Sequence, residues 1–154
     1  MGTGGGGARA VVVVSRYNEA VTRKLLDGAL AELAEHGWPG ERVDVVWVPG
    51  AFELPLAVDR ALATGHYRLA VALGAVIRGE TAHFDHIAQA AAQGIREAAV
   101  RFGLPVGFGV LTCDTQAQAL ARAGGEAGNK GAEAAASAVE MVRVLDALAE
   151  RVAT

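Results

Sequence analysis

Four short apolar runs place the strongest limit on how this chain can fold. Each run is largely continuous and rich in β-branched side chains; they are AVVVV at residues 10–14, VDVVWV at 43–48, RLAVALGAVI at 68–77 and LPVGFGVLT at 104–112. Strands that are covered on both faces of a parallel sheet have this continuous pattern, whereas strands with one wet face alternate. The runs therefore predict a parallel sheet buried on both sides.

Helical patterns fill the gaps between these runs. We expect helices after Asn18 until Gly37, over residues 51–63, from Thr81 to Phe102, over 116–122 and over 130 to about 149. Asn18, Asp114 and Asn129 are the expected N-caps. Alternating strands and helices form right-handed βαβ units, so the sequence predicts a three-layer α/β/α domain with a four-stranded parallel sheet. This domain covers residues 10–154, after a flexible Gly-rich arm at residues 1–9.

The composition disfavours several classes of partner. The 154 residues carry a formal charge of −3 without a basic stripe, which argues against nucleic acid. No apolar run is long enough to cross a bilayer, so we expect no membrane partner. Cys113 is the single cysteine and the sequence has no signal-peptide pattern. An internal disulfide is therefore impossible, and we expect a cytoplasmic protein.

The last predicted helix is apolar on more than one side. Its apolar positions spread beyond a single stripe; they include Ala134, Ala135, Ala138, Val139, Met141, Val142, Val144 and Leu145. Such a helix needs a second surface to cover it, so we infer an oligomer.

Polar and aromatic residues gather where the predicted strands end. The segments that follow the four runs contain SRYN, PGAFE, RGETAHFDH and CDTQ. Ligands of open parallel sheets bind beyond the carboxyl ends of the strands. Aromatic rings beside titratable and small residues at this edge favour a small-molecule site over scattered loop polarity.

The chain resembles the lumazine synthase family over residues 11 to about 145. The resemblance is carried by SRYNEAVTRKLLDGA, VPGAFELP, GAVIRGETAHFDHIA and AGNKGAEAAASAVEM, which have the order and spacing of that family. It implies a flavodoxin-like fold and the penultimate step of riboflavin biosynthesis. In that step 5-amino-6-(D-ribitylamino)uracil condenses with 3,4-dihydroxy-2-butanone 4-phosphate to 6,7-dimethyl-8-ribityllumazine, phosphate and water. It also implies that no metal or organic cofactor takes part.

The resemblance implies roles for individual residues. His83 matches the proton-transfer histidine, and an imidazole suits a reaction in which every step moves protons. Asp85 has two candidate roles: it orients His83, or it simply favours the positive end of the helix. Tyr17 takes the stacking position, where Phe is commoner in the family. The remaining residues expected around the ribitylaminouracil are Ala51, Phe52, Glu53, the backbone of Ala75, Val76 and Ile77, and Phe108 from a neighbouring subunit.

The phosphate group of the butanone phosphate is best bound by hydrogen-bond donors whose charge does not change with pH. By resemblance, Arg122 supplies a guanidinium fork, and Gly79, Glu80 and Thr81 supply amides and a hydroxyl. Lys130 is a further candidate for assistance. The plainer alternatives are that Arg122 is a solvated residue at a helix end, and that His83 and Asp85 face water at a helix start.

Other functions have less support in the sequence. His83, Asp85 and His86 have ligand-type side chains, but their spacing does not converge on a metal. GGEAGNKG follows a helix and lacks the ending of a phosphate-binding loop. Two rivals remain open: a flavin- or phosphate-binding module, which would not need His83 and Arg122 together, and a non-catalytic lumazine-binding or cage-forming paralogue, which would lose site residues.

The resemblance also implies partners. It indicates pentamers with sites at subunit interfaces, in many members closed into an icosahedral 60-mer shell, and riboflavin synthase as a partner. The short Gly-rich arm is a poor strand and favours a looser assembly. The compact GGEAGNKG connection favours the shell, so the sequence leaves the assembly open.

Overall fold

The computed structural model describes residues 7–153, and it contains a four-stranded parallel sheet with the order β2-β1-β3-β4. The strands are β1 (Arg9–Ser15), β2 (Val43–Val48), β3 (Tyr67–Ile77) and β4 (Val106–Cys113). All four apolar runs are therefore confirmed as strands. β1 already begins within the arm expected over residues 1–9, and residues 1–6 of that arm lie outside the described part of the chain.

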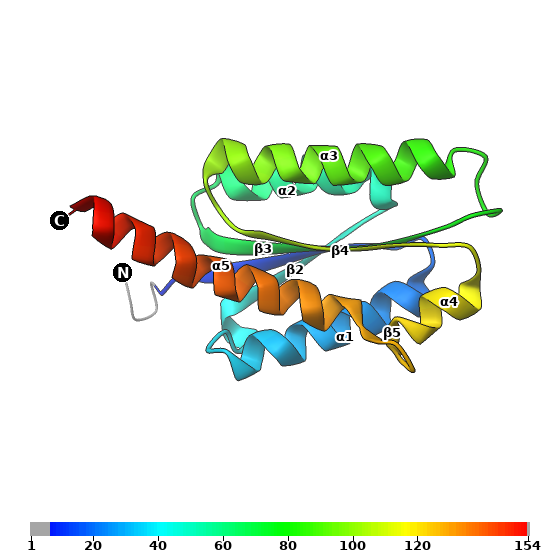
Figure 1. Cartoon of the computed structure of the whole chain (residues 1–154), viewed down its shortest axis with the longest axis horizontal. Coiled ribbons are helices and arrows are strands. Elements are labelled where there is room, and N and C mark those ends of the chain that lie inside the picture. The colour runs from blue at the N-terminus through cyan, green and yellow to red at the C-terminus, as the bar shows by residue number, and fades with distance from the viewer. Residues whose placement is uncertain (1–6, 154) are drawn as a thin grey trace.

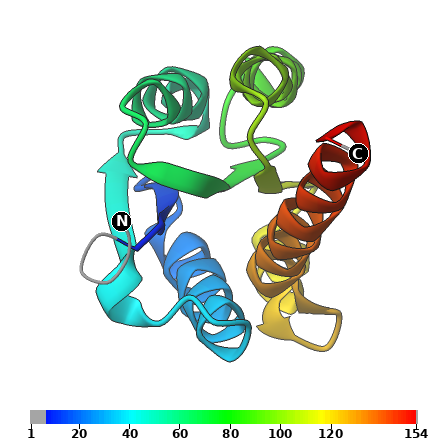
Figure 2. The same ribbon diagram turned by 90° about the vertical axis from the view of Figure 1, so that its left-hand side faces the viewer.

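Helices cover both faces of the sheet (Figures 1 and 2), which confirms the three-layer α/β/α prediction. One face carries α2 (Leu54–Ala63) and α3 (Phe84–Phe102), and the other carries α1 (Glu19–Glu35) and α5 (Lys130–Ala153), with the short α4 (Gln116–Ala121) beside them. Each face has its own apolar core. Burial of these two cores is the main force that holds the layers together.

Central and edge strands differ in burial. In β1 and β3 nearly every side chain is buried, as the continuous pattern predicts. In the edge strand β2 the prediction is wrong, because Val45 and Val46 are each 38% exposed. At the other edge, a Cβ at Gly107 would collide with the backbone of Ala134, so glycine there lets α5 lie against β4.

Several predicted boundaries need correction. Asn18 precedes α1, but its side chain does not cap the helix. Thr115 rather than Asp114 caps α4, because its Oγ1 accepts from the Gln118 amide at 3.1 Å. The third helix begins at Phe84, three residues after Thr81. Asn129 is confirmed as a cap, since its Oδ1 accepts from the Ala132 amide at 3.0 Å.

The GGEAGNKG connection forms a small hairpin that the sequence analysis did not predict. β5 (Ala123–Gly125) pairs antiparallel with β6 (Gly128–Asn129), between α4 and α5. The Asn129 side chain also donates to the Lys24 carbonyl at 3.1 Å, which ties this hairpin to α1. The segment therefore serves to position the start of α5.

A polar cluster lies at the amino end of the sheet. The Arg9 guanidinium donates to both Asp44 oxygens, at 3.2 and 2.6 Å, and the Tyr67 hydroxyl donates to Asp44 at 2.7 Å. The hydrogen bonds from Arg9 and then Tyr67 lower the pKa of Asp44. Burial, followed by the bond to Asp44, raises the pKa of Tyr67. These bonds join β1, β2 and β3 at this end.

Candidate active site

A cavity of about 390 Å³ opens at the carboxyl ends of the three strands β1, β2 and β3. Nine residues singled out from the sequence line it, namely Tyr17, Ala51, Phe52, Glu53, Ala75, Val76, Ile77, Glu80 and Thr81. Pro49, Gly50 and Ile87 complete the lining. The segments after these three strands therefore converge on one cavity, as expected for a parallel sheet.

Tyr17 lies at the rim of this cavity on the segment between β1 and α1. The Arg16 and Tyr17 amides donate to the Val48 and Pro49 carbonyls, at 2.8 and 3.0 Å, which fixes this backbone against the end of β2. The Tyr17 side chain is 53% exposed, and its hydroxyl makes no hydrogen bond within residues 7–153. Its ring face is thus available for stacking on a flat ligand.

Phe52 and Glu53 follow β2 on a short 3-10 turn, Ala51–Glu53. Phe52 is 61% exposed, so its ring lies at the surface and not in the core. Glu53 has a local partner that the sequence analysis missed, because its Oε1 accepts from the Gly50 amide at 2.9 Å. This bond holds the carboxylate at the cavity in a fixed orientation.

The buried end of β3 forms the floor of the cavity through Ala75, Val76 and Ile77. One of the backbone groups expected to face a ligand is already engaged, because the Asn18 Nδ2 donates to the Ala75 carbonyl at 3.1 Å. The sequence pattern predicts Asn18 only as a helix cap. Its tolerance of left-handed backbone conformations was the signal that pointed to a different role.

The turn between β3 and α3 has less spare hydrogen-bonding capacity than expected. The Glu80 amide donates to the Ile77 carbonyl at 3.2 Å, and the Thr81 hydroxyl accepts from the His83 amide at 3.1 Å. Gly79 has a positive φ of 90°, which allows the chain to turn here. The Glu80 amide is therefore committed to the turn in this state.

His83 lies at the N-cap position of α3, is exposed, and is not among the residues lining the strand-end cavity. Its ring centroid lies 6.4 Å from that of His86. Within the described residues no hydrogen bond joins Asp85 to His83, so the structure does not support the expected orienting contact. Both side chains have the exposure that the plainer alternative predicts.

Arg78 links the ends of β3 and β4. Its Nε donates to Asp114 Oδ1 at 2.9 Å, and its guanidinium lies 4.4 Å from the centre of the Phe84 ring. Asp114, the expected helix cap, is instead the partner of Arg78.

The residues predicted to hold the phosphate do not meet in one cavity. Arg122 lines a separate cavity of about 340 Å³ with Cys113, Lys130 and Glu133, whereas Glu80 and Thr81 line the strand-end cavity. The Arg122 Nη1 contacts the buried Cys113 Sγ at 3.7 Å and the Gln118 carbonyl at 3.4 Å. The single subsite expected from Glu80, Thr81 and Arg122 is therefore divided.

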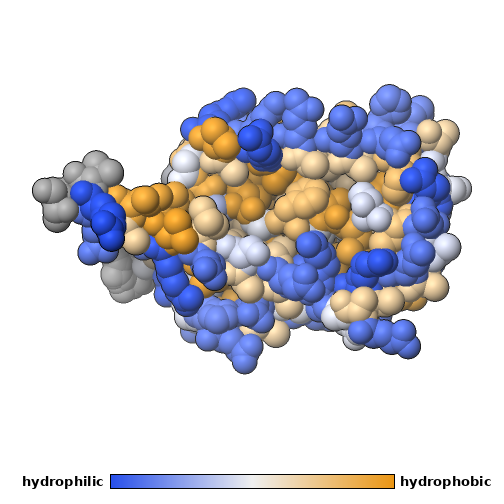
Figure 3. Space-filling model, in the orientation of Figure 1, coloured by the Kyte–Doolittle hydropathy of each residue, from blue (hydrophilic) through white to orange (hydrophobic). Residues whose placement is uncertain are grey.

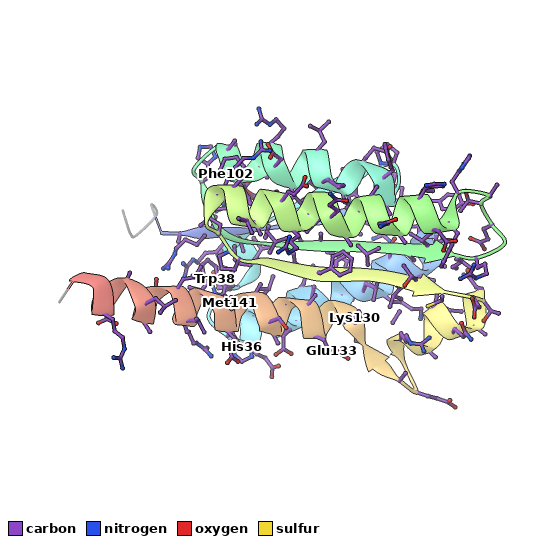
Figure 4. All side chains as sticks on the ribbon, turned by 45° about the horizontal axis from the view of Figure 1, so that its top comes forward. His36, Trp38, Phe102, Lys130, Glu133 and Met141 are labelled. Atoms are coloured by element: carbon purple, nitrogen blue, oxygen red, sulfur yellow. The ribbon has the colours of Figure 1, made fainter. Side chains whose placement is uncertain are left out.

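Phe108 lies on the same side of the molecule as Arg122. It is 38% exposed on β4 and lines a groove of about 400 Å³ with Lys130, Glu133 and Met141. Figure 4 shows Lys130, Glu133 and Met141 along α5, and Figure 3 shows apolar surface gathered between α3 and α5. Lys130 and Glu133 line both cavities of this side, which makes the two cavities neighbours.

Residues 7–153 contain no group of three or more His, Cys, Asp or Glu side chains that could hold a metal ion. No helix in this range is both long and apolar enough to cross a membrane.

Comparison with known proteins identifies the family. A family profile described as 6,7-dimethyl-8-ribityllumazine synthase matches residues 7–146. A curated protein of Gemmatimonas aurantiaca, named 6,7-dimethyl-8-ribityllumazine synthase, is 54% identical over 142 residues, which are 92% of this chain and 87% of that protein. The match covers both the strand-end cavity and the β4 side of the molecule. The chain therefore belongs to the 6,7-dimethyl-8-ribityllumazine synthase family.

Proposed function

We propose that this chain condenses 5-amino-6-(D-ribitylamino)uracil with 3,4-dihydroxy-2-butanone 4-phosphate at the strand-end cavity. The products are 6,7-dimethyl-8-ribityllumazine, phosphate and water, in the penultimate step of riboflavin biosynthesis. The family match supports the reaction. The observation that carries the location is the convergence of nine predicted residues on one cavity of about 390 Å³.

The strand-end cavity suits the ribitylaminouracil. Tyr17 offers an exposed ring face, Phe52 adds a second exposed ring at the rim, and the end of β3 offers backbone groups to the polar edge of the pyrimidine. Glu53 is the acceptor for ribityl hydroxyls, with an orientation fixed by the Gly50 amide. The proposal needs no nucleophilic side chain, because the amine of the substrate attacks the ketone.

His83 is the proton-transfer residue of the proposal. The amine adds to the ketone, and water leaves to give an imine. Elimination of phosphate then gives an enol, which tautomerises to a new carbonyl at the former C3 hydroxyl, and the ribityl-bearing amine closes the ring on this carbonyl with loss of a second water. An imidazole can accept and return the protons of these steps, and such help is typically worth about 100- to 10,000-fold in rate. The remaining acceleration comes from holding two substrates in one orientation.

A second copy of the chain completes the site in this proposal. Phe108, Arg122 and Lys130 line cavities on the β4 and α5 side, separate from the strand-end cavity. Met141, Val144 and Leu148 leave an exposed apolar surface on α5, which a neighbouring copy can cover. A ring of copies, with pentamers as the expected form and a 60-mer shell as the larger one, brings the two sides together.

The residues proposed to bind the phosphate are likewise divided between two copies of the chain. Arg122 and Lys130 come from one copy and supply the positive charge, while Thr81 and the turn at Gly79 come from the other. Asp85 is left with a secondary role at the start of α3, where a carboxylate is favoured by the helix dipole.

The setting of the reaction is also a proposal. We infer that residues 10–154 act as one domain in the cytoplasm, and that riboflavin synthase, which consumes the product, is a partner. The single cysteine supports a reducing compartment, since Cys113 is buried as a free thiol.

The direct test mixes purified protein with both substrates and follows the absorbance of the lumazine against a protein-free blank. The blank is essential because amine and ketone can condense slowly without an enzyme. Product formation above the blank that falls in His83→Ala supports the reaction and the site together. Folded protein that does not exceed the blank would favour the binding or cage-forming paralogue.

A further inference from the structure

Asn18 has an unusual backbone conformation at the edge of the strand-end cavity. Its φ and ψ are 64° and 46°, and it is the only non-glycine residue with a positive φ among residues 7–153. Asn adopts this left-handed region more readily than most residues, but glycine adopts it at no steric cost. The choice of Asn at this position therefore points to a use for its side chain.

The side chain of Asn18 does not serve α1. Only the backbone carbonyl of Asn18 bonds to the start of α1, because it accepts hydrogen bonds from the Val21 and Thr22 amides at 2.9 and 3.0 Å. A side-chain cap would typically stabilise the helix by about 1 kcal/mol. α1 lacks this side-chain cap, because the Asn18 side-chain Nδ2 instead donates to the Ala75 carbonyl at 3.1 Å, 57 residues away in the sequence.

The Asn18–Ala75 bond joins the two parts of the cavity that face a flat ligand from different directions. Tyr17, the neighbour of Asn18, is held on its other side by the bond from its amide to the Pro49 carbonyl at 3.0 Å. Ala75 begins the backbone floor at the end of β3. The aromatic rim is therefore tied to β2 by a backbone bond and to β3 by the Asn18 side chain.

We propose that Asn18 is a positioning residue, which sets the spacing between the Tyr17 ring and the backbone of residues 75–77 and so tunes affinity for the pyrimidine substrate. The inference rests on the proposed function, because it concerns the ribitylaminouracil subsite. It also means that the Ala75 carbonyl is already hydrogen-bonded to Asn18. The polar edge of the pyrimidine therefore pairs with the backbone groups of Val76 and Ile77.

The test uses Asn18→Gly in the full chain. Glycine keeps the left-handed backbone and removes only the side chain, so the fold is retained. Loss of one partly buried hydrogen bond should raise KM for the ribitylaminouracil by about three- to tenfold. KM for the butanone phosphate should stay within about twofold, because its predicted contacts lie elsewhere. Asn18→Asp keeps the shape but replaces the donor with a carboxylate, and should raise the same KM at least as much.

Thr22→Val is the matched control. The Thr22 hydroxyl donates to the Ser15 carbonyl at 2.7 Å, so it is also a side-chain bond at the start of α1, but it is fully buried and does not line the cavity. Its loss should lower the midpoint of urea unfolding without separating the two KM values. A merely structural role for Asn18 would give the same pattern as this control.

The outcomes are distinct. A rise in KM for the ribitylaminouracil alone, in both Asn18 variants, supports the positioning role. Unchanged KM values, or equal rises for both substrates as general loosening would give, overturn it while the wild-type chain remains active. A wild-type chain that makes no lumazine above the blank overturns the proposed function itself.

Discussion

The two ends of the sheet both carry polar residues, but the residues are arranged in opposite ways. At the amino end Arg9, Asp44 and Tyr67 satisfy one another, with three hydrogen bonds to one carboxylate. At the carboxyl end the Tyr17 hydroxyl and the Glu80 side chain make no hydrogen bond or ion pair within the described residues. Mutual satisfaction is typical of a structural cluster, whereas uncommitted polar groups around a cavity are typical of a binding site.

This difference separates stability from activity. Substitutions at the carboxyl end should change kinetic constants more than stability, and substitutions at the amino end should do the reverse. The following predictions test this separation.

Replacement of His83 should have the largest effect. His83→Ala removes the proposed proton-transfer group, so kcat should fall by about 100-fold or more, with residual activity from substrate orientation. Single-turnover measurements of lumazine formation report the chemical step directly. An unchanged single-turnover rate would mean that exposed His83 is only a solvated residue at a helix start.

Arg122→Ala should act mainly on one substrate. Loss of a charged hydrogen bond to phosphate should raise KM for the butanone phosphate by about 10- to 100-fold, with little change in KM for the ribitylaminouracil. Initial rates with each substrate varied in turn give both constants. Equal changes in both KM values would instead fit a structural role at the end of α4.

Tyr17 allows the ring and the hydroxyl to be tested separately. Tyr17→Ala removes the stacking face and should raise KM for the ribitylaminouracil by about tenfold. Tyr17→Phe is the matched control and should stay within about twofold, because the hydroxyl has no hydrogen-bond partner in the described structure. A large rise in KM for the ribitylaminouracil in Tyr17→Phe would contradict this expectation, because it would reveal a polar contact that the hydroxyl makes only with substrate.

Asp44→Asn should have the smallest effect, and on stability alone. The folded state lowers the pKa of Asp44 through Arg9 and then Tyr67, so the stabilisation is present above the ordinary aspartate pKa and is lost as the pH falls through the lowered value. Because the Asp44 side chain is 41% exposed, solvent screening limits the difference to about 0.5 kcal/mol. Urea unfolding of both proteins at pH 7 and pH 3 measures it. A difference that is as large at pH 3 as at pH 7, or a loss of activity at pH 7, would contradict the prediction.

The strand-end half of the site was accessible to sequence reasoning for a simple physical reason. Continuous apolar runs identified the strands, and parallel strands direct their following segments to one edge. The meeting of Tyr17, Phe52 and Val76 in one cavity could therefore be predicted without knowledge of the loop conformations.

Contacts made by individual side chains were less accessible. The sequence cannot tell whether an Asn or Asp near a helix start caps the helix or bonds elsewhere, because several geometries satisfy the same group. Asn18 therefore proved to bond Ala75, and Asp114 proved to bond Arg78. The continuous apolar pattern also failed to identify β2 as a half-exposed edge strand, because the pattern of one strand does not specify its position in the sheet.

In the proposed function the β4 side acts together with a second copy of the chain. Arg122 and Phe108 line cavities separate from the one that holds Glu80 and Thr81. Family resemblance could assign them roles, but local spacing could not indicate that they would line cavities apart from Glu80 and Thr81.

The central claim is that two copies of the chain build one active site, and co-assembly of two impaired variants tests it most directly. His83→Ala and Arg122→Ala chains are co-expressed with different tags, and the mixed oligomer is purified through both. Rates are measured at a butanone phosphate concentration below the wild-type KM, where both single variants are slow. If His83 and Arg122 come from different copies, about a quarter of the sites regain both residues, and activity should rise towards a quarter of wild type. Activity that stays at the average of the two single variants would show that both residues act within one chain, and would contradict the account.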